Sequence, residues 1–146
     1  MFMGEYHHNL DDKSRLILPS KFREDLKSTF VITRGLENCL FVYPMDEWNK
    51  IVAKLSNLPF TKKASREFNR FFLSGATVQE FDKQGRMSIP QSLKEYASLT
   101  KECTVIGVGE RLEIWDSASF NAFLTEKEED MASIAESLFE GFDGEI

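Results

Sequence analysis

The chain has 146 residues, 42% of them hydrophobic and 29% charged, which is the composition of an ordinary globular domain. It contains no run of about 20 apolar residues and no basic-then-apolar leader, so we expect a cytoplasmic protein without a membrane span. The net charge of −6 disfavours a phosphate-rich partner, but eight of the 24 acidic residues lie from Glu126 onward, beside one base. The remainder holds 16 acidic and 17 basic residues, so the acidity belongs to the C-terminal tail.

The first half of the chain is predicted to contain four strands and a helix. Alternating apolar residues and polar turns place the strands at residues 5–10, 16–18, 30–33 and 40–43, and the helix at 20–26. Pro19 ends the second strand, because proline has no N–H to donate to a ladder. Phe22 and Leu26 then lie four positions apart, which is helical spacing.

The second half repeats this order of elements. Asp11, Arg15 and Pro19 recur 71 residues later as Asp82, Arg86 and Pro90, and the hairpins recur at an offset of 72. The second set of strands is expected at residues 77–81, 87–89, 103–106 and 112–115, with a helix at 91–97. A unit of about 70 residues is marginal on its own, so we expect the two repeats to share one core about a pseudo-twofold axis.

Helices are expected outside the repeated strands. Apolar stripes predict them after each hairpin, at residues 45–55 and 117–124, between the repeats, and in the acidic tail. The predicted division is a first repeat, a linker helix, a second repeat and an acidic helix or tail, at residues 1–58, 59–75, 76–125 and 126–146.

The Asp-x-x-x-Arg segments are the best candidates for a functional site. If the strands around each turn form a hairpin, Asp11 lies beside Arg15 and Asp82 beside Arg86, and a bidentate contact holds each guanidinium in one direction. One interpretation is a turn-closing ion pair, which a duplicated fold would repeat. The other is a two-stranded ribbon that offers both arginines to guanine in the major groove of DNA. Four more basic residues would contact phosphates, namely Lys13, Lys21, Arg23 and Lys83.

Catalysis and metal binding have little support in the sequence. His7 and His8 are adjacent on a predicted strand and point to opposite faces, so they do not form one metal site. Cys39 and Cys103 lie in predicted strands and are expected to be buried free thiols, with a disulfide as the alternative. No nucleophile signature or phosphate loop is present, so we expect no enzyme, cofactor, metal or small-molecule substrate.

With these motifs, the whole chain resembles the MraZ family of bacterial regulators, related in fold to the AbrB and MazE swapped-hairpin DNA-binding proteins. The resemblance rests on the two Asp-x-x-x-Arg segments with the proline and helix that follow, on Met-x-Gly-Glu-Tyr near the start, and on Gly-x-x-x-x-Leu-x-Val-Tyr. It implies a nucleoid-associated, sequence-specific transcription factor that acts on the promoter of the division and cell-wall gene cluster and assembles into a ring. Arg15 and Arg86 would contact DNA, oriented by Asp11 and Asp82.

The expected fold class is therefore α/β of the α+β type. Two tandem β-β-α-β-β repeats would form a pseudo-twofold, double-split (swapped-hairpin) β-barrel flanked by helices. The residues before the acidic tail carry a net charge near +1, so a single chain is expected to attract DNA only weakly. We therefore expect a homo-oligomeric ring to bind double-stranded DNA at repeated short sites. The alternative is an oligomeric scaffold with structural Asp–Arg pairs and a tail that recruits a basic partner. Ser14, where the second turn has Gly85, predicts a stiffer first turn.

Overall fold

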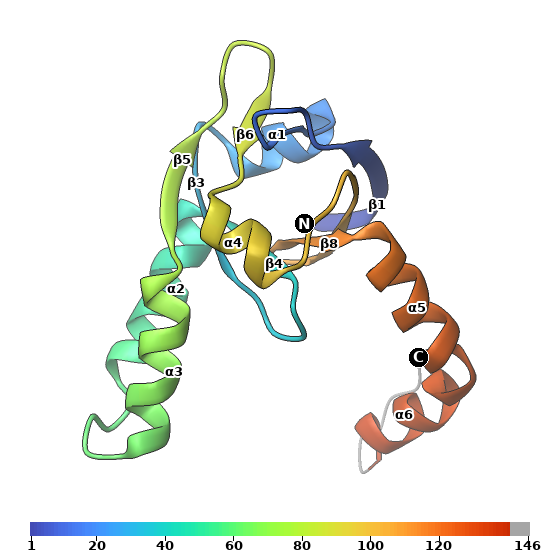
Figure 1. Ribbon diagram of the computed structural model, residues 1–146. Coiled ribbons are helices and arrows are strands. Elements are labelled where there is room, and N and C mark those ends of the chain that lie inside the picture. The colour runs from blue at the N-terminus through green and yellow to red at the C-terminus, as the bar shows by residue number, and fades with distance from the viewer. Residues whose placement is uncertain (141–146) are drawn as a thin grey trace.

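The structure, a computed structural model, describes residues 1–140 and consists of a central β body with two pairs of helices extending from it (Figure 1). The strands in this range are β1 (Phe2–Asn9), β2 (Arg15–Ile17), β3 (Thr29–Arg34), β4 (Leu40–Pro44), β5 (Thr77–Glu80), β6 (Arg86–Ser88), β7 (Glu102–Gly109) and β8 (Leu112–Asp116). The helices are α1 (Ser20–Leu26), α2 (Met45–Ser56), α3 (Lys63–Ser74), α4 (Gln91–Tyr96), α5 (Ser117–Lys127), the 3₁₀ turn η1 (Glu128–Asp130) and α6 (Met131–Leu138). The predicted α+β class is confirmed.

The two repeats are interleaved in one antiparallel sheet. Its strand order is β1-β7-β8-β4-β3-β5, so the first strand of each repeat pairs with the hairpin of the other repeat. A separate two-stranded ribbon joins β2 to β6. In the described range these strands do not close into the expected barrel, because β1 and β5 are the edges of the larger sheet.

One detail of the predicted pairing is wrong. We expected the strands on either side of each Asp–Arg turn to form a hairpin, but β1 pairs with β7 and β2 pairs with β6. The physical reason is that all eight residues of β1 are already matched along β7, and the turn directs the chain out of that sheet. The three-residue β2 then finds its hydrogen-bond partners in its counterpart from the other repeat.

The core is shared by both halves, as predicted. On one face of the sheet, the first hydrophobic cluster joins side chains of both repeats around Leu16 and Met87, which face each other across the ribbon and are fully buried. Burying such a side chain stabilises the fold by about 1.5–3 kcal/mol. Leu40 and Val42 point into this cluster, whereas Phe41 and Tyr43 point to the opposite face, so β4 follows the two-residue period of a strand.

The opposite face of the sheet carries an aromatic cluster from which the helices extend. Trp48 of α2 and Phe120 of α5, 72 residues apart, both pack in this cluster, beside Tyr43 and Trp115 respectively. We call residues 45–74, with α2 and α3, leg 1, and residues 117–138, with α5, η1 and α6, leg 2. Both legs extend from the same side of the body and diverge (Figure 1).

The predicted helices are present at these places. Proline precedes α1 and α4 as predicted, and Asp116 caps α5 by accepting a hydrogen bond from the Ser119 backbone N–H at 3.3 Å. The predicted tail helix corresponds to η1 and α6, while the last six tail residues, 141–146, lie outside the described range. Within residues 1–140, every helix is too short or too polar to cross a bilayer.

Candidate nucleic-acid interface

The first Asp–Arg turn is organised around the carboxylate of Asp11. Its Oδ1 accepts hydrogen bonds from the backbone N–H groups of Lys13 and Arg15, both at 2.9 Å, and its Oδ2 accepts one from Arg15 Nε at 2.7 Å. The Ser14 backbone N–H donates to the Asp11 carbonyl at 3.0 Å and closes the turn. One carboxylate thus fixes both the backbone of the turn and the direction of the arginine.

The second turn repeats this arrangement. Asp82 Oδ1 accepts from the backbone N–H groups of Gln84 and Arg86 at 2.9 Å, and Oδ2 accepts from Arg86 Nε at 2.7 Å. The predicted Asp–Arg pairs are therefore confirmed in both copies, but the predicted bidentate contact is wrong. Because Oδ1 is occupied by backbone donors, the carboxylate holds only Nε, and the terminal amino groups of the guanidinium lie outside the pair.

The terminal amino groups differ between the two arginines. Arg86 Nη2 donates to the Gln84 side chain at 3.2 Å, and Arg86 Nη1 lies 3.9 Å from Asp11 Oδ2. The Nη groups of Arg15 have no hydrogen-bond partner among residues 1–140. The Arg15 and Arg86 side chains are 26% and 23% exposed, respectively, so each guanidinium is held at the surface and reaches solvent on one side.

The electrostatics of the turns keep both carboxylates ionised. For Asp82 the backbone hydrogen bond from Arg86 is the largest influence, and it lowers the pKa below the ordinary 3.8. For Asp11 partial desolvation raises the pKa, but the hydrogen bonds from Arg15 and Lys13 together outweigh it and the net pKa is lowered. Each arginine therefore faces a charged partner throughout the neutral range.

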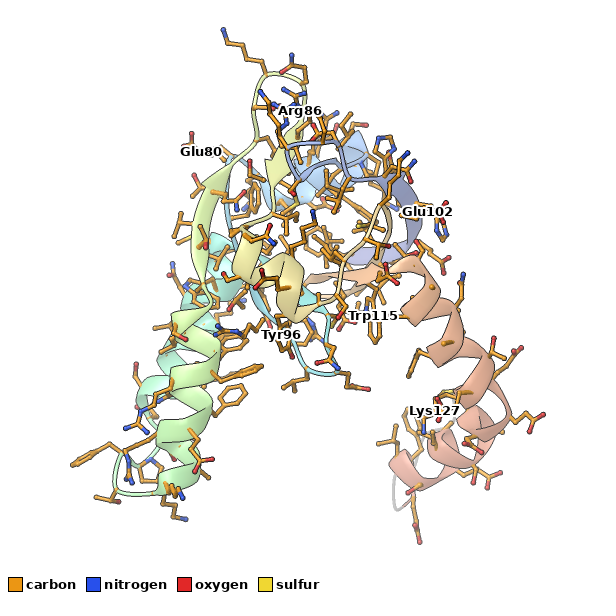
Figure 2. All side chains as sticks on the ribbon, in the orientation of Figure 1. Glu80, Arg86, Tyr96, Glu102, Trp115 and Lys127 are labelled. Atoms are coloured by element: carbon orange, nitrogen blue, oxygen red, sulfur yellow. The ribbon has the colours of Figure 1, made fainter. Side chains whose placement is uncertain are left out.

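The tertiary structure places the two turns side by side. The Ile89 backbone N–H donates to the Ser14 carbonyl at 2.9 Å, and the Leu18 N–H donates to the Gly85 carbonyl at 3.5 Å. The ribbon of β2 and β6 therefore ends on each side in the turn of the other repeat. The two turns form one surface, at the end of the body opposite the legs, as the position of Arg86 in Figure 2 shows.

Each turn is also contacted by a basic residue from a helix of the other repeat. Lys94 of α4 donates to Ser14 Oγ at 3.1 Å. Arg23 of α1 lies against Gly85, where an added Cβ would come within 1.8 Å of Arg23 Nη1. Sequence reasoning missed Lys94, although the signal was present, because Lys94 lies 71 residues after Arg23, the repeat offset of the turns.

The predicted phosphate-contacting residues divide into two groups. Lys13, Lys21 and Lys83 are exposed, the first and last in the two turns and Lys21 at the start of α1. Arg23 is only partly exposed, and its buried Nε has no hydrogen-bond partner in the described part of the chain. Its position against Gly85 makes it a support for the second turn as well as a source of charge.

A polar cavity of about 480 Å³ lies beside the C-terminal end of β1, lined in part by His7, His8 and Ser117. His7 Nδ1 is 3.2 Å from Thr104 Oγ1, which in turn is 2.8 Å from Ser117 Oγ. Thr104 is fully buried and separates the serine from the imidazole, so this is not the geometry of an activated nucleophile. The described residues hold no group of three His, Cys, Asp or Glu side chains arranged for a metal.

Both cysteines are buried free thiols, as predicted. Burial is the main reason that the pKa of Cys103 rises to about 12, and it raises the pKa of Cys39 as well. Neither thiol is therefore a reactive thiolate at neutral pH.

A family model described as MraZ protein, antitoxin-like, matches the chain twice, over residues 1–71 and 72–142. The chain belongs to the MraZ family. The two MraZ matches each contain one Asp–Arg turn and one hairpin, so the repeat seen in the residues is the repeat of the family. The family is of the regulator type, and the resemblance based on the two turns is confirmed.

Proposed function

We propose that this MraZ-family chain is a sequence-specific transcriptional regulator that binds double-stranded DNA through its two Asp–Arg turns, in the manner of the swapped-hairpin proteins AbrB and MazE. The observation that supports this most is that Nε and the terminal amino groups of Arg15 differ in whether they have a partner. Its Nε is held by Asp11 at 2.7 Å, while its terminal amino groups have no partner within residues 1–140. Recognition of guanine by arginine uses two N–H donors in a fixed plane, and an oriented guanidinium supplies them.

The arrangement of the ribbon supports the same function. The major groove admits a two-stranded ribbon, and the β2–β6 ribbon has an arginine turn at each end. Lys13, Lys21 and Lys83 would contact phosphates and set the affinity without selecting the sequence. Arg23 and Lys94 would hold the two turns at a fixed spacing from the opposite repeat.

Assembly and target are further parts of the proposal. The body outside the acidic tail carries a charge near +1, so one chain has few charges with which to hold a duplex. A homo-oligomeric ring would align many turns along an array of short promoter sites and gain avidity without new contacts. The family resemblance supports the promoter of the division and cell-wall gene cluster as the target and association with the nucleoid.

The test is a DNA-binding measurement on Arg15→Ala with Arg86→Ala, using fluorescence anisotropy on upstream DNA and on scrambled DNA over a range of salt concentrations. The matched control is Lys27→Ala with Lys50→Ala, which also removes two positive charges, each from an ion pair outside the two turns. Loss of one base contact costs about 1–3 kcal/mol of discrimination, so the arginine variant should lose specificity for upstream DNA at least about fivefold. The control should keep it.

The second candidate function is an oligomeric scaffold that does not bind DNA. It is favoured by one observation, namely that each Asp carboxylate accepts two backbone N–H groups and so closes its own turn. The same measurement separates the two functions. If wild-type protein shows no salt-dependent DNA binding, or if the arginine variant binds upstream DNA as the wild type does, the scaffold is the better account.

A further inference from the structure

The two turns differ in the side chain that lies two residues after the aspartate. It is Lys13 in the first turn and Gln84 in the second, and both are exposed. Gln84 Oε1 accepts a hydrogen bond from Arg86 Nη2 at 3.2 Å. A lysine side chain has N–H donors and no acceptor, so Lys13 cannot make the equivalent bond to Arg15. Residue type alone therefore makes the two arginines unequal.

This hydrogen bond gives the Arg86 guanidinium a second point of attachment. Nε is held by Asp82 at 2.7 Å and Nη2 by Gln84, so two acceptors lie along one edge of the planar group. Asp11 Oδ2, 3.9 Å from Nη1, adds attraction from another side. Two hydrogen bonds fix the plane of the guanidinium, whereas the single bond at Nε leaves the plane of Arg15 less restricted. The other edge of Arg86, between Nη1 and Nη2, keeps the pair of donors that guanine O6 and N7 accept.

The second turn does not need the Gln84 side chain in order to close. Asp82 Oδ1 accepts from the backbone N–H of Gln84 at 2.9 Å, and the Gly85 N–H donates to the Asp82 carbonyl at 3.0 Å. Both bonds use main-chain donors, so any residue with a backbone N–H makes the first of them at position 84. The side chain is therefore available for a role other than turn closure.

The Gln84 carboxamide keeps further hydrogen-bonding capacity. Its Nε2 has no partner within residues 1–140, and Arg86 occupies only one of the two lone pairs of Oε1. An acceptor and a donor on one amide are the pair that reads adenine, through N6 and N7. The 3.2 Å between Gln84 Oε1 and Arg86 Nη2 is close to the spacing of stacked bases, about 3.4 Å, so the two side chains suit adjoining base pairs.

We propose that Gln84 is a specificity-determining residue of the DNA-binding surface. It holds the Arg86 guanidinium in the plane that reads a guanine, and its own carboxamide reads an adenine in the adjoining base pair. The second turn then selects two neighbouring base pairs, whereas the first turn selects one guanine through Arg15 and contacts phosphate through Lys13. This inference rests on the proposed function and adds which base pairs the two repeats distinguish and why they differ.

The experiment compares the sequences that each variant selects from a pool of randomised double-stranded DNA, read by sequencing. Gln84→Ala removes both roles of the side chain. Gln84→Glu keeps an acceptor for Arg86 but loses the amide donor, and a carboxylate accepts from cytosine N4. Arg86→Ala identifies the guanine of the second turn. The matched control is Gln91→Ala, which removes an exposed amide that donates to Glu95 outside the turns. Circular dichroism checks that every variant folds.

Wild-type protein and Gln91→Ala should enrich a guanine with an adenine beside it, and Arg86→Ala should lose that guanine. Gln84→Ala should lose discrimination at both base pairs, each by at least about fivefold, and Gln84→Glu should keep the guanine and prefer cytosine to adenine beside it.

Three results would overturn the role of Gln84 and leave sequence-specific binding in place. They are a Gln84→Ala protein that selects the wild-type sequences, one that binds all sequences more weakly by the same factor, and a Gln84→Glu protein that still prefers adenine. Wild-type protein that enriches no sequence would instead refute the proposed function, and the role of Gln84 with it.

Discussion

Replacing Gly85 by alanine perturbs the second turn in two ways that the structure separates. Gly85 has φ of +75°, a left-handed conformation in which a side chain costs about 1–2 kcal/mol. The new Cβ would also lie 1.8 Å from Arg23 Nη1 and 2.8 Å from its Cζ. Because these atoms are the end of a flexible side chain, Arg23 moves away and the backbone of the turn stays in place. We therefore expect a loss of about 1–2 kcal/mol in the free energy of unfolding.

The assay is thermal unfolding followed by circular dichroism, with all variants at one protein concentration because an oligomer melts in a concentration-dependent way. For a chain of this size, about 1 kcal/mol corresponds to roughly 2–4 °C in Tm. The matched control is Ser14→Gly at the equivalent position, where φ is +57°. Glycine adopts this left-handed backbone conformation more readily than serine does, and this gain offsets the loss of the Lys94–Ser14 hydrogen bond. We therefore expect little change in Tm.

A double-substitution cycle tests the contribution of Arg23. In an Arg23→Ala background the side chain that Cβ would meet is absent, so any steric part of the Gly85→Ala cost should disappear and the backbone part should remain. A Gly85→Ala protein that melts with the wild type, or one that loses no more than Ser14→Gly, would refute this reasoning about the turn.

Leu16→Ala or Met87→Ala at the pseudo-twofold axis should lower the free energy of unfolding by about 2–5 kcal/mol, because both side chains are fully buried. Urea denaturation measures this loss. If each substitution lowered the free energy of unfolding by less than about 1 kcal/mol, the result would contradict a shared core. Cys39 and Cys103 should react with a thiol reagent at about pH 8 only when the protein unfolds, because burial raises the pKa of both thiols. Rapid labelling of either cysteine in the native protein would contradict this prediction. Asp82 has a folded pKa below the ordinary 3.8, so its contribution to stability is present above that pH and is lost as the pH falls through the lowered pKa. Asp82→Asn should make the free energy of unfolding fall less steeply as the pH is lowered. If the substitution left this acid part of the stability profile unchanged, the turn would not be stabilising the charged form of this carboxylate.

Local chemistry was predictable where neighbouring residues in sequence determine it. Each Asp lies four residues before its Arg, with a residue in a left-handed conformation between them, and the same hydrogen bonds form in both copies. Proline before α1 and α4, and Asp116 before α5, likewise act within a few residues of their position. The Nε geometry was missed because competition by backbone N–H groups for Oδ1 depends on the folded turn.

The order of residues was enough to show that the chain is a duplicated unit, to locate the two turns, and to tell most strands from helices by their period. The folded structure was needed to show that β2 pairs with β6, that each turn is supported by Arg23 or Lys94 from the other repeat, and that the two legs diverge. The physical reason is that a strand's alternation specifies a buried face and not a partner, so either copy of a repeated strand satisfies the same pattern. The choice follows from burying Leu16 and Met87 together in one core, a contact between residues 71 positions apart.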